Sequence, residues 1–169
     1  MSELVLRSRQ RTRKIDLALL RRITEEVLRG LHDGPGEIAI HLVDAKRMAS
    51  INEQFLQHEG STDVITFDYA EYEKDETKGS TFSGEIFISV PDAVEQAEEF
   101  GTSWQSEVAR YVIHGLLHLK GYDDLEPSAR RLMKREENRW VRRITKLFPV
   151  DQLGKEPARA ARPAPRRER

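Results

Sequence analysis

The sequence predicts a small α+β domain. Two observations support this fold class: apolar residues recur at helical spacing in about five stretches, and four short stretches have the pattern of β-strands. Four strands mixed with helices argue against a doubly wound sheet. At 169 residues, the chain is most simply one domain over residues 1–150, followed by a basic tail over residues 151–169 that we expect to be disordered.

The predicted elements follow from local start and stop signals. Strands are expected at residues 3–7, 38–42, 63–67 and 84–90. Helices are expected after the N-caps Asp16, Asp44 and Ser103, between Pro91 and Gly101, and from Glu126 onward. The last helix is expected to bury Leu132, Trp140, Ile144 and Leu147. Its outer face is basic, with eight Lys/Arg between residues 130 and 146.

Three candidate metal ligands lie within eleven residues, in the motif His114-x3-His118-x2-Gly121-x2-Asp124. Residues four apart share one face of a helix, so both imidazoles could reach one cation. Gly121 is placed to end the helix in a left-handed conformation, and this reversal would bring Asp124 back toward the histidines. Two imidazoles and a carboxylate leave the fourth position of a tetrahedral zinc ion open, as in catalytic zinc sites.

Alternatives to this site remain open in the sequence. A histidine pair at this spacing also occurs by chance among core or surface residues, although the apolar residues around this pair favour a metal, because buried imidazoles need polar partners. Asp123 competes with Asp124 for the third position, and we prefer Asp124 because its neighbour should point elsewhere. The same ligands also suit Fe(II), Mn or Ni.

A zinc ion with an open position could serve peptide or phosphodiester hydrolysis, because it activates water and polarises carbonyl or phosphoryl oxygens. Peptidases of the H-E-x-x-H type place a glutamate, their general base, directly after the first histidine. This chain has Gly115 at that position. RNA cleavage does not need that glutamate, since water or the ribose 2′-hydroxyl can attack the phosphorus. We therefore favour RNA and keep a zincin-type metallopeptidase as a weaker alternative.

The net charge of −1 conceals an uneven distribution. Residues 51–100 contain thirteen Asp/Glu and two Lys/Arg, whereas residues 101–169 contain sixteen Lys/Arg and nine Asp/Glu. A basic region beside an acidic one suits a polyanion bound at one face, although a solvated helix and a tail would explain much of the same excess. No apolar run is long enough to span a bilayer and the first residues lack a signal-peptide core, so a cytoplasmic protein is expected. Without cysteine, disulfides and thiolate metal sites are excluded.

The segment from His114 to Asp124 resembles the signature of the YbeY family of bacterial rRNA maturation factors, H-G-x-L-H-L-x-G-Y-D-H. The similarity extends to Ile51-Asn52, to residues 61–67 and to residues 84–90, and covers roughly residues 3–148. The resemblance implies a four-stranded mixed sheet flanked by helices. It also implies a zinc-dependent, single-strand-specific endoribonuclease that acts in 16S rRNA 3′-end maturation and ribosome quality control.

This resemblance further implies one zinc ion per chain and ribosomal RNA of the small ribosomal subunit as the partner, for a protein that we expect to be a monomer. The alternative from another class is a non-catalytic ribosome-assembly factor with a structural zinc. Removal of the metal would distinguish the two hypotheses. A protein that stays folded but loses cleavage would favour the enzyme, and a protein that unfolds would favour a structural zinc.

Two positions depart from the family's pattern. Asp124 stands where most members have a third histidine; a carboxylate can still ligate zinc, but it adds negative charge. Many members also have an arginine after an aromatic residue near Asn52, whereas here Leu56 follows Phe55. His58 could take over part of that role, or it could be an ordinary loop histidine.

Other residues are candidates for substrate contacts. Thr62 and Asp63 are, with His58, the candidate catalytic residues beside a metal-activated water. They could contact the substrate near the metal, or they could simply form a turn at the start of a strand. The candidate phosphate contacts are all basic: Arg7, Arg9, Arg131, Lys134 and Arg135. For the first two, a solvated strand edge is the alternative.

Overall fold

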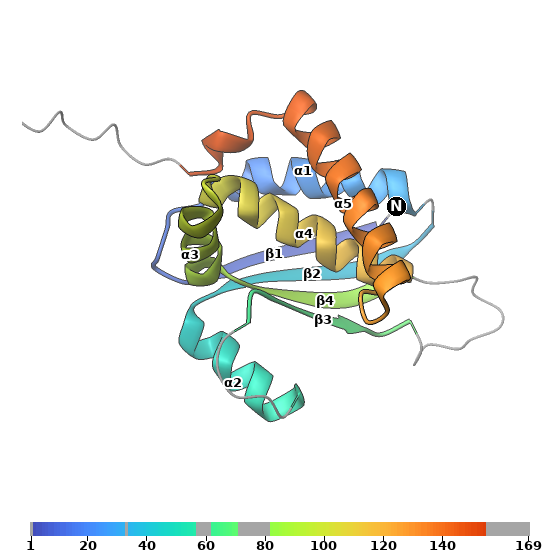
Figure 1. Cartoon of the computed structure of the whole chain (residues 1–169), viewed down its shortest axis with the longest axis horizontal. Coiled ribbons are helices and arrows are strands. Elements are labelled where there is room, and N and C mark those ends of the chain that lie inside the picture. The colour runs from blue at the N-terminus through green and yellow to red at the C-terminus, as the bar shows by residue number, and fades with distance from the viewer. Residues whose placement is uncertain (1, 33, 57–61, 71–81, 155–169) are drawn as a thin grey trace, which may run out of the picture.

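A four-stranded mixed sheet forms the base of the molecule (Figure 1). The computed structural model describes residues 2–32, 34–56, 62–70 and 82–154. The strands are β1 (Ser2–Arg9), β2 (Gly36–Val43), β3 (Val64–Asp68) and β4 (Phe82–Ser89), in the spatial order β1-β2-β4-β3. The first two neighbouring pairs are parallel, and β3 runs antiparallel to β4 at one edge. The sheet therefore confirms the expected α+β class.

In these described ranges, five α-helices cover the two faces of the sheet unequally. They are α1 (Leu17–Leu31), α2 (Ala45–Leu56), α3 (Val90–Phe100), α4 (Trp104–Lys120) and α5 (Pro127–Leu147), and a short 3₁₀ helix, η1 (Val150–Leu153), follows them. Figure 1 shows α1, α3, α4 and α5 on one side of the sheet and α2 on the other. None of the helices in the described ranges is long and apolar enough to cross a membrane.

Capping residues begin the helices where the sequence predicts. The Asp16 carboxylate accepts a hydrogen bond from the Leu19 amide at 3.1 Å, and Asp44 accepts one from Arg47 at 2.7 Å. Ser103 caps α4 by accepting from the Ser106 amide at 3.2 Å. Each bond satisfies a backbone donor that would otherwise have no partner in the first turn.

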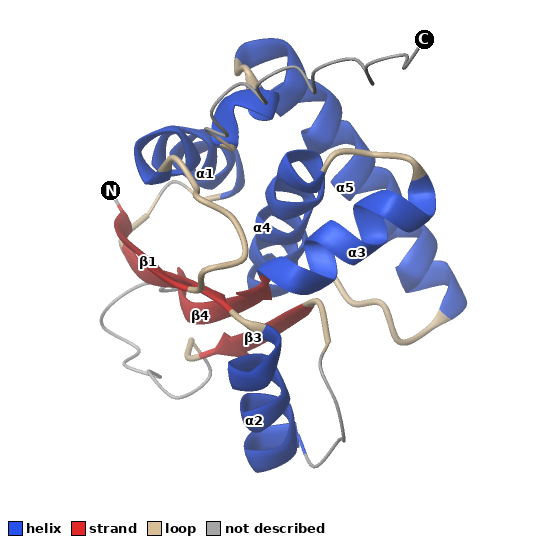
Figure 2. Cartoon of the chain, turned by 90° about the vertical axis from the view of Figure 1, so that its left-hand side faces the viewer, coloured by secondary structure: helices blue, strands red, loops and turns tan. Residues whose placement is uncertain are grey.

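The central helix of the layer is α4, which lies between α1 and α3 above the sheet (Figure 2). Its middle is fully buried: Val112, Ile113 and Leu116 have no exposed surface. The alternating isoleucines of β2 and β4, among them Ile40 and Ile86, face this helix in the main core. Residues near the end of α4 are therefore held by the best-packed part of the molecule.

The inward face of α5 differs from the sequence prediction. Trp140 and Ile144 are buried as expected, but Leu132 is 43 % exposed and Leu147 is 55 % exposed. The other buried residues of this helix are Met133 and Glu137. The sequence prediction assigned the inward face by apolar character alone. The buried positions instead follow helical spacing, and one of them is the charged residue Glu137.

Residues 151–154, which follow the expected end of the domain at residue 150, are within the part of the chain that the structure describes. Leu153 in η1 has no exposed surface, and its carbonyl accepts a hydrogen bond from the Asp16 amide at 2.8 Å. Gly154 forms an isolated bridge with Ile15. Residues 155–169, which make up most of the expected tail, lie outside the described residues.

Candidate metal centre

The two histidines of the motif lie near the C-terminal end of α4. Gly121 ends this helix with φ of 110°, a left-handed conformation that glycine adopts without steric cost. The amides of Gly121 and Tyr122 donate to the carbonyls of His118 and Leu117, each at 3.0 Å. This termination satisfies the last carbonyls of the helix and turns the chain back.

The reversed chain brings Asp124 to the histidines, as the motif predicts. Nε2 of His114 lies 3.1 Å from Nε2 of His118. Oδ2 of Asp124 lies 3.6 Å from each of these nitrogens. Within the described residues these three side chains form a group that could hold a metal ion.

The donor triangle fits a divalent cation such as zinc. Zinc bonds to nitrogen and oxygen of about 2.0–2.1 Å at tetrahedral angles would separate neighbouring ligand atoms by roughly 3.3 Å. The observed edges of 3.1, 3.6 and 3.6 Å bracket that value. The three side chains are 26–40 % exposed, so a fourth position can be reached from solvent.

Asp123, the competing carboxylate, has a different role. Its Oδ1 accepts hydrogen bonds from the amides of Asp124 at 2.7 Å and Leu125 at 3.1 Å. It thereby stabilises the turn that carries Asp124. The Arg130 guanidinium also donates to the Asp124 carbonyl at 3.1 Å, which attaches this turn to the start of α5.

Glu137 of α5 contacts the ring nitrogen of His114 that faces away from the other candidate ligands. Oε2 of this buried glutamate lies 2.8 Å from Nδ1 of His114, and Oε1 accepts from Arg110 at 2.7 Å. A hydrogen bond at Nδ1 fixes the imidazole so that Nε2 presents its lone pair to a metal. The sequence analysis missed this residue, although a glutamate in register with Met133, Trp140 and Ile144 was a readable signal.

The electrostatics of the site agree with this arrangement. Burial lowers the pKa of His114, but the hydrogen bond and charge of Glu137 outweigh burial and raise it overall. Burial and the neighbouring His114 lower the pKa of His118. Burial raises the pKa of Glu137, but its bonds to His114 and Arg110 outweigh burial and lower it. Glu137 is thus an anion at neutral pH, and His118 is a neutral imidazole with a lone pair available to a metal.

Thr62 and Asp63 face the same hollow as the three candidate ligands. This hollow, of about 440 Å³, lies between the end of α4 and the edge strand β3. Oδ1 of Asp63 accepts from the Val64 amide at 2.9 Å and lies 3.4 Å from the Thr62 hydroxyl. Oδ2 of Asp63 accepts from Gln96 at 3.4 Å. The two residues begin a strand and also lie beside the ligands, so both expected roles remain compatible with their position.

The basic candidates divide into two groups. Lys134 lines a cleft that also includes His114 and Asp124, and Arg131 and Arg135 are exposed on the first turns of α5. Arg7 and Arg9 are exposed on β1, at the sheet edge opposite β3. Three strand spacings of about 4.8 Å put them roughly 14 Å or more from β3.

The structure describes only part of the expected RNA-contacting segment. His58 lies outside the described residues. Leu56 is the last residue of α2, which lies on the opposite side of the sheet from α4 (Figure 1).

Gly115, the residue after the first histidine, packs directly against the sheet. A Cβ atom added there would lie 2.8 Å from Cδ1 and Cγ2 of Ile86. That distance is too short for any larger side chain without a shift of α4 or β4. A glutamate in the manner of the H-E-x-x-H peptidases therefore has no room at this position.

Comparison with known proteins gives the family. The family model described as "Endoribonuclease YbeY" matches residues 5–145. The chain belongs to this family.

Curated members of the YbeY family are similar to most of the chain. "Endoribonuclease YbeY" of Bacteroides thetaiotaomicron is 39 % identical over 104 residues, which are 62 % of this chain and 71 % of that protein. The protein of the same name from Chlorobium luteolum is 36 % identical over 132 residues, 78 % of this chain and 91 % of the relative. That from Salinibacter ruber is 30 % identical over 135 residues, 79 % and 86 % of the two chains.

The fold also resembles a solved structure. The solution structure of TM1509 from Thermotoga maritima superimposes with a TM-score of 0.61 and 23 % sequence identity, covering 94 % of this chain and 99 % of TM1509. At this identity the comparison supports the fold alone.

Proposed function

We propose that this chain is a zinc-dependent endoribonuclease that cleaves single-stranded RNA during 16S rRNA 3′-end maturation and ribosome quality control. The observation that carries the proposal is the triangle of His114, His118 and Asp124, in a chain of the endoribonuclease YbeY family. In this proposal the three side chains hold one zinc ion per chain. Ribosomal RNA of the small subunit is the substrate.

A divalent ion at this centre supplies Lewis acidity, which activates water and polarises a phosphoryl oxygen. The protein supplies orientation and proton transfer. Glu137 holds the His114 ring in its ligating orientation. We assign proton acceptance from the attacking water to Oδ2 of Asp63, and Thr62, 3.4 Å from Oδ1, orients that carboxylate.

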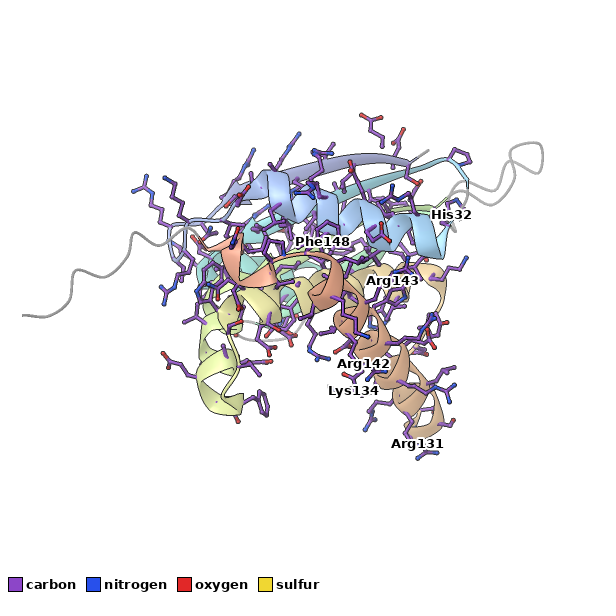
Figure 3. The ribbon with its side chains drawn as sticks, turned by 90° about the horizontal axis from the view of Figure 1, so that it is seen from above. His32, Arg131, Lys134, Arg142, Arg143 and Phe148 are labelled. Atoms are coloured by element: carbon purple, nitrogen blue, oxygen red, sulfur yellow. The ribbon has the colours of Figure 1, made fainter. Side chains whose placement is uncertain are left out.

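Basic residues of α5 would hold the RNA backbone next to the centre. Lys134 is 64 % exposed and lines the cleft beside His114, and Arg131 lies on the same helix (Figure 3). Arg135, also exposed on α5, adds to this basic surface. Side chains of this kind neutralise phosphates without reading sequence. Arg7 and Arg9 would meet only RNA that extends to the far edge of the sheet.

The location of the centre favours catalysis over a structural zinc. The ligands sit at the exposed end of a helix whose core packing does not involve them. A structural zinc would be expected to replace missing core, as it does in small zinc domains. A peptidase is disfavoured because Gly115 leaves no space for the glutamate base.

Cleavage of a labelled single-stranded RNA by the zinc-loaded protein tests the proposal, with the same RNA in a duplex as the comparison. We expect the single strand to be cut, the duplex to resist, and a chelator to abolish cleavage while the circular dichroism spectrum persists. His118→Ala should be inactive. Unfolding on chelation would support a structural zinc, and a chelated protein that still cuts RNA would refute the metal-dependent mechanism.

The ribosomal role needs its own substrate. Small subunits that carry 16S rRNA with an unprocessed 3′ end are incubated with the wild type and with His118→Ala, and the 3′ ends are mapped. Trimming to the mature end by the wild type alone is the expected result. Cleavage of free oligonucleotides but not of these particles would restrict the proposal to a general single-strand endoribonuclease.

A further inference from the structure

A second hollow opens beside the metal centre, between α3, α4 and α5. It has a volume of about 410 Å³ and shares His114 and Asp124 with the hollow that faces Thr62. Cavities of this size are typical of sites for small organic groups. A substrate in one hollow can therefore continue into the other past His114.

The cleft has one exposed aromatic wall. Phe100, the last residue of α3, lines the cleft and is 66 % exposed. Its backbone is held in place, because Gly101 ends α3 in the left-handed conformation and the Thr102 hydroxyl donates to Glu107 of α4 at 2.8 Å. A large apolar ring held in solvent at the mouth of a polar cleft is a typical stacking surface for nucleic-acid bases.

Charged side chains of both signs line the cleft, and the carboxylates of Asp63 and Asp124 lie where it meets the first hollow. The buried carboxylates have partners inside the protein: Glu107 bonds Thr102, and Glu137 bonds Arg110 and His114. The cations Arg130 and Lys134 lie on the opposite side from Phe100, on α5, where both are exposed. Figure 3 shows α3 and α5 diverging as two arms, with Lys134 labelled on the second. An anionic backbone would thus meet cations at the rim, and an uncharged base would meet the interior.

We propose that this cleft is a subsite for a nucleobase, and that Phe100 stacks on the base of the nucleotide next to the scissile phosphate. The inference rests on the proposed endoribonuclease function and adds to it a specificity-determining residue. Arg130 and Lys134 hold the phosphate of that nucleotide. A base can enter the cleft only when it is unstacked and unpaired, so the subsite provides a physical reason for single-strand specificity.

An abasic scan tests the proposal. A single-stranded RNA of ten nucleotides with one cut position carries an abasic residue at each position in turn, and kcat/KM is measured for the wild type and Phe100→Ala. Leu147→Ala is the matched control, because Leu147 is a similarly exposed apolar residue near the far end of α5. Thermal unfolding of both variants reports on folding, which an exposed side chain should not alter.

Stacking on an aromatic side chain predicts a loss of about 5- to 150-fold when either partner is removed. We expect one abasic position beside the cut to lower kcat/KM of the wild type by at least fivefold. Phe100→Ala should lose a similar factor on intact RNA and lose nothing more at that position. Phe100→Trp should retain wild-type cleavage and the same sensitive position, which a merely structural role of Phe100 would not predict.

The failures are distinguishable. A wild type that cuts RNA, beside a Phe100→Ala variant with unchanged kcat/KM, overturns the subsite and leaves the proposed function intact. The subsite is also overturned if Phe100→Ala lowers kcat/KM by the same factor on intact RNA and on every abasic RNA, because the variant and the missing base would then act independently. A folded, zinc-loaded wild type that cuts no RNA overturns the proposed function and the subsite together.

Discussion

Glu137 and His114, on two different helices, are joined by a 2.8 Å hydrogen bond between Oε2 and Nδ1. This contact links the end of α4 that carries the candidate ligands to the buried face of α5. It also selects the ring nitrogen that faces the other candidate ligands, because the second nitrogen is already occupied. The orientation of His114 is therefore set by a residue 23 positions away in the sequence.

Removal of this contact should weaken metal binding. Glu137→Gln keeps the shape of the side chain but replaces the anion that accepts from His114 and Arg110. We expect zinc affinity to fall about 10- to 100-fold, the usual cost of losing such a supporting group. Competition with a chromophoric chelator measures it. Glu136→Gln is the control, because Glu136 pairs with Arg139 at the surface; an equal loss in both variants would contradict the assigned role.

Metal content should depend on Asp124 and not on its neighbour. We expect His118→Ala and Asp124→Ala to lose stoichiometric zinc, measured by elemental analysis of the purified proteins after dialysis. Asp123→Asn should keep zinc, because an asparagine oxygen can still accept from the Asp124 and Leu125 amides. Full zinc in Asp124→Ala beside depleted zinc in Asp123→Asn would reverse the ligand assignment.

Gly115→Ala should destabilise the fold through a clash with Ile86. The added Cβ would lie 2.8 Å from two of its carbons. We expect a loss of about 1–3 kcal/mol in the free energy of unfolding, as for other overpacked cores. Urea denaturation measures it. The same substitution in an Ile86→Ala background should cost less, since the clashing atoms are absent; strictly additive losses would show that the clash is not the cause.

Acid should weaken the contact between α1 and α5. The hydrogen bond from Arg143 at 2.9 Å lowers the pKa of Glu26 most, against the smaller opposing effect of burial, and Arg29 lowers it further. Because the folded pKa is depressed, the stabilisation is present above the ordinary glutamate value of about 4.3 and is lost as pH falls through the folded value.

We therefore expect Glu26→Gln to reduce stability at pH 7 by about 0.2–1 kcal/mol, the range for ion pairs near the surface. The difference from the wild type should shrink below about pH 4.3. Thermal unfolding at pH 7, 5 and 3 measures this dependence. A constant difference across these values would mean that the ionised pair is not its source.

Local signals in the sequence were sufficient for the elements and for the three candidate ligands. Asp16 and Ser103 mark helix starts through bonds to amides three residues ahead, and Gly121 marks a helix end. Because both histidines and the aspartate lie within one helix turn and one chain reversal, spacing alone brings them together.

Features that depend on long-range packing were not predictable in this way. The burial of Glu137 results from its contacts with α4, and apolar content alone misplaced Leu132 and Leu147 on the inner face of α5. Arg7 is far from the centre because β1 is the edge strand opposite β3 among the described strands, and strand order is not encoded in the strand itself. The attachment of η1 is of the same kind, because it depends on a hydrogen bond to a distant residue, Asp16.

The most deeply buried helix of the molecule carries two of the three candidate ligands. Amides in the middle of such a helix exchange hydrogen for deuterium only when the whole domain opens. The spacing of the two imidazoles therefore persists for as long as the protein remains folded. Zinc would meet the pair of nitrogens with the Asp124 carboxylate already 3.6 Å from each of them, so little rearrangement would accompany binding.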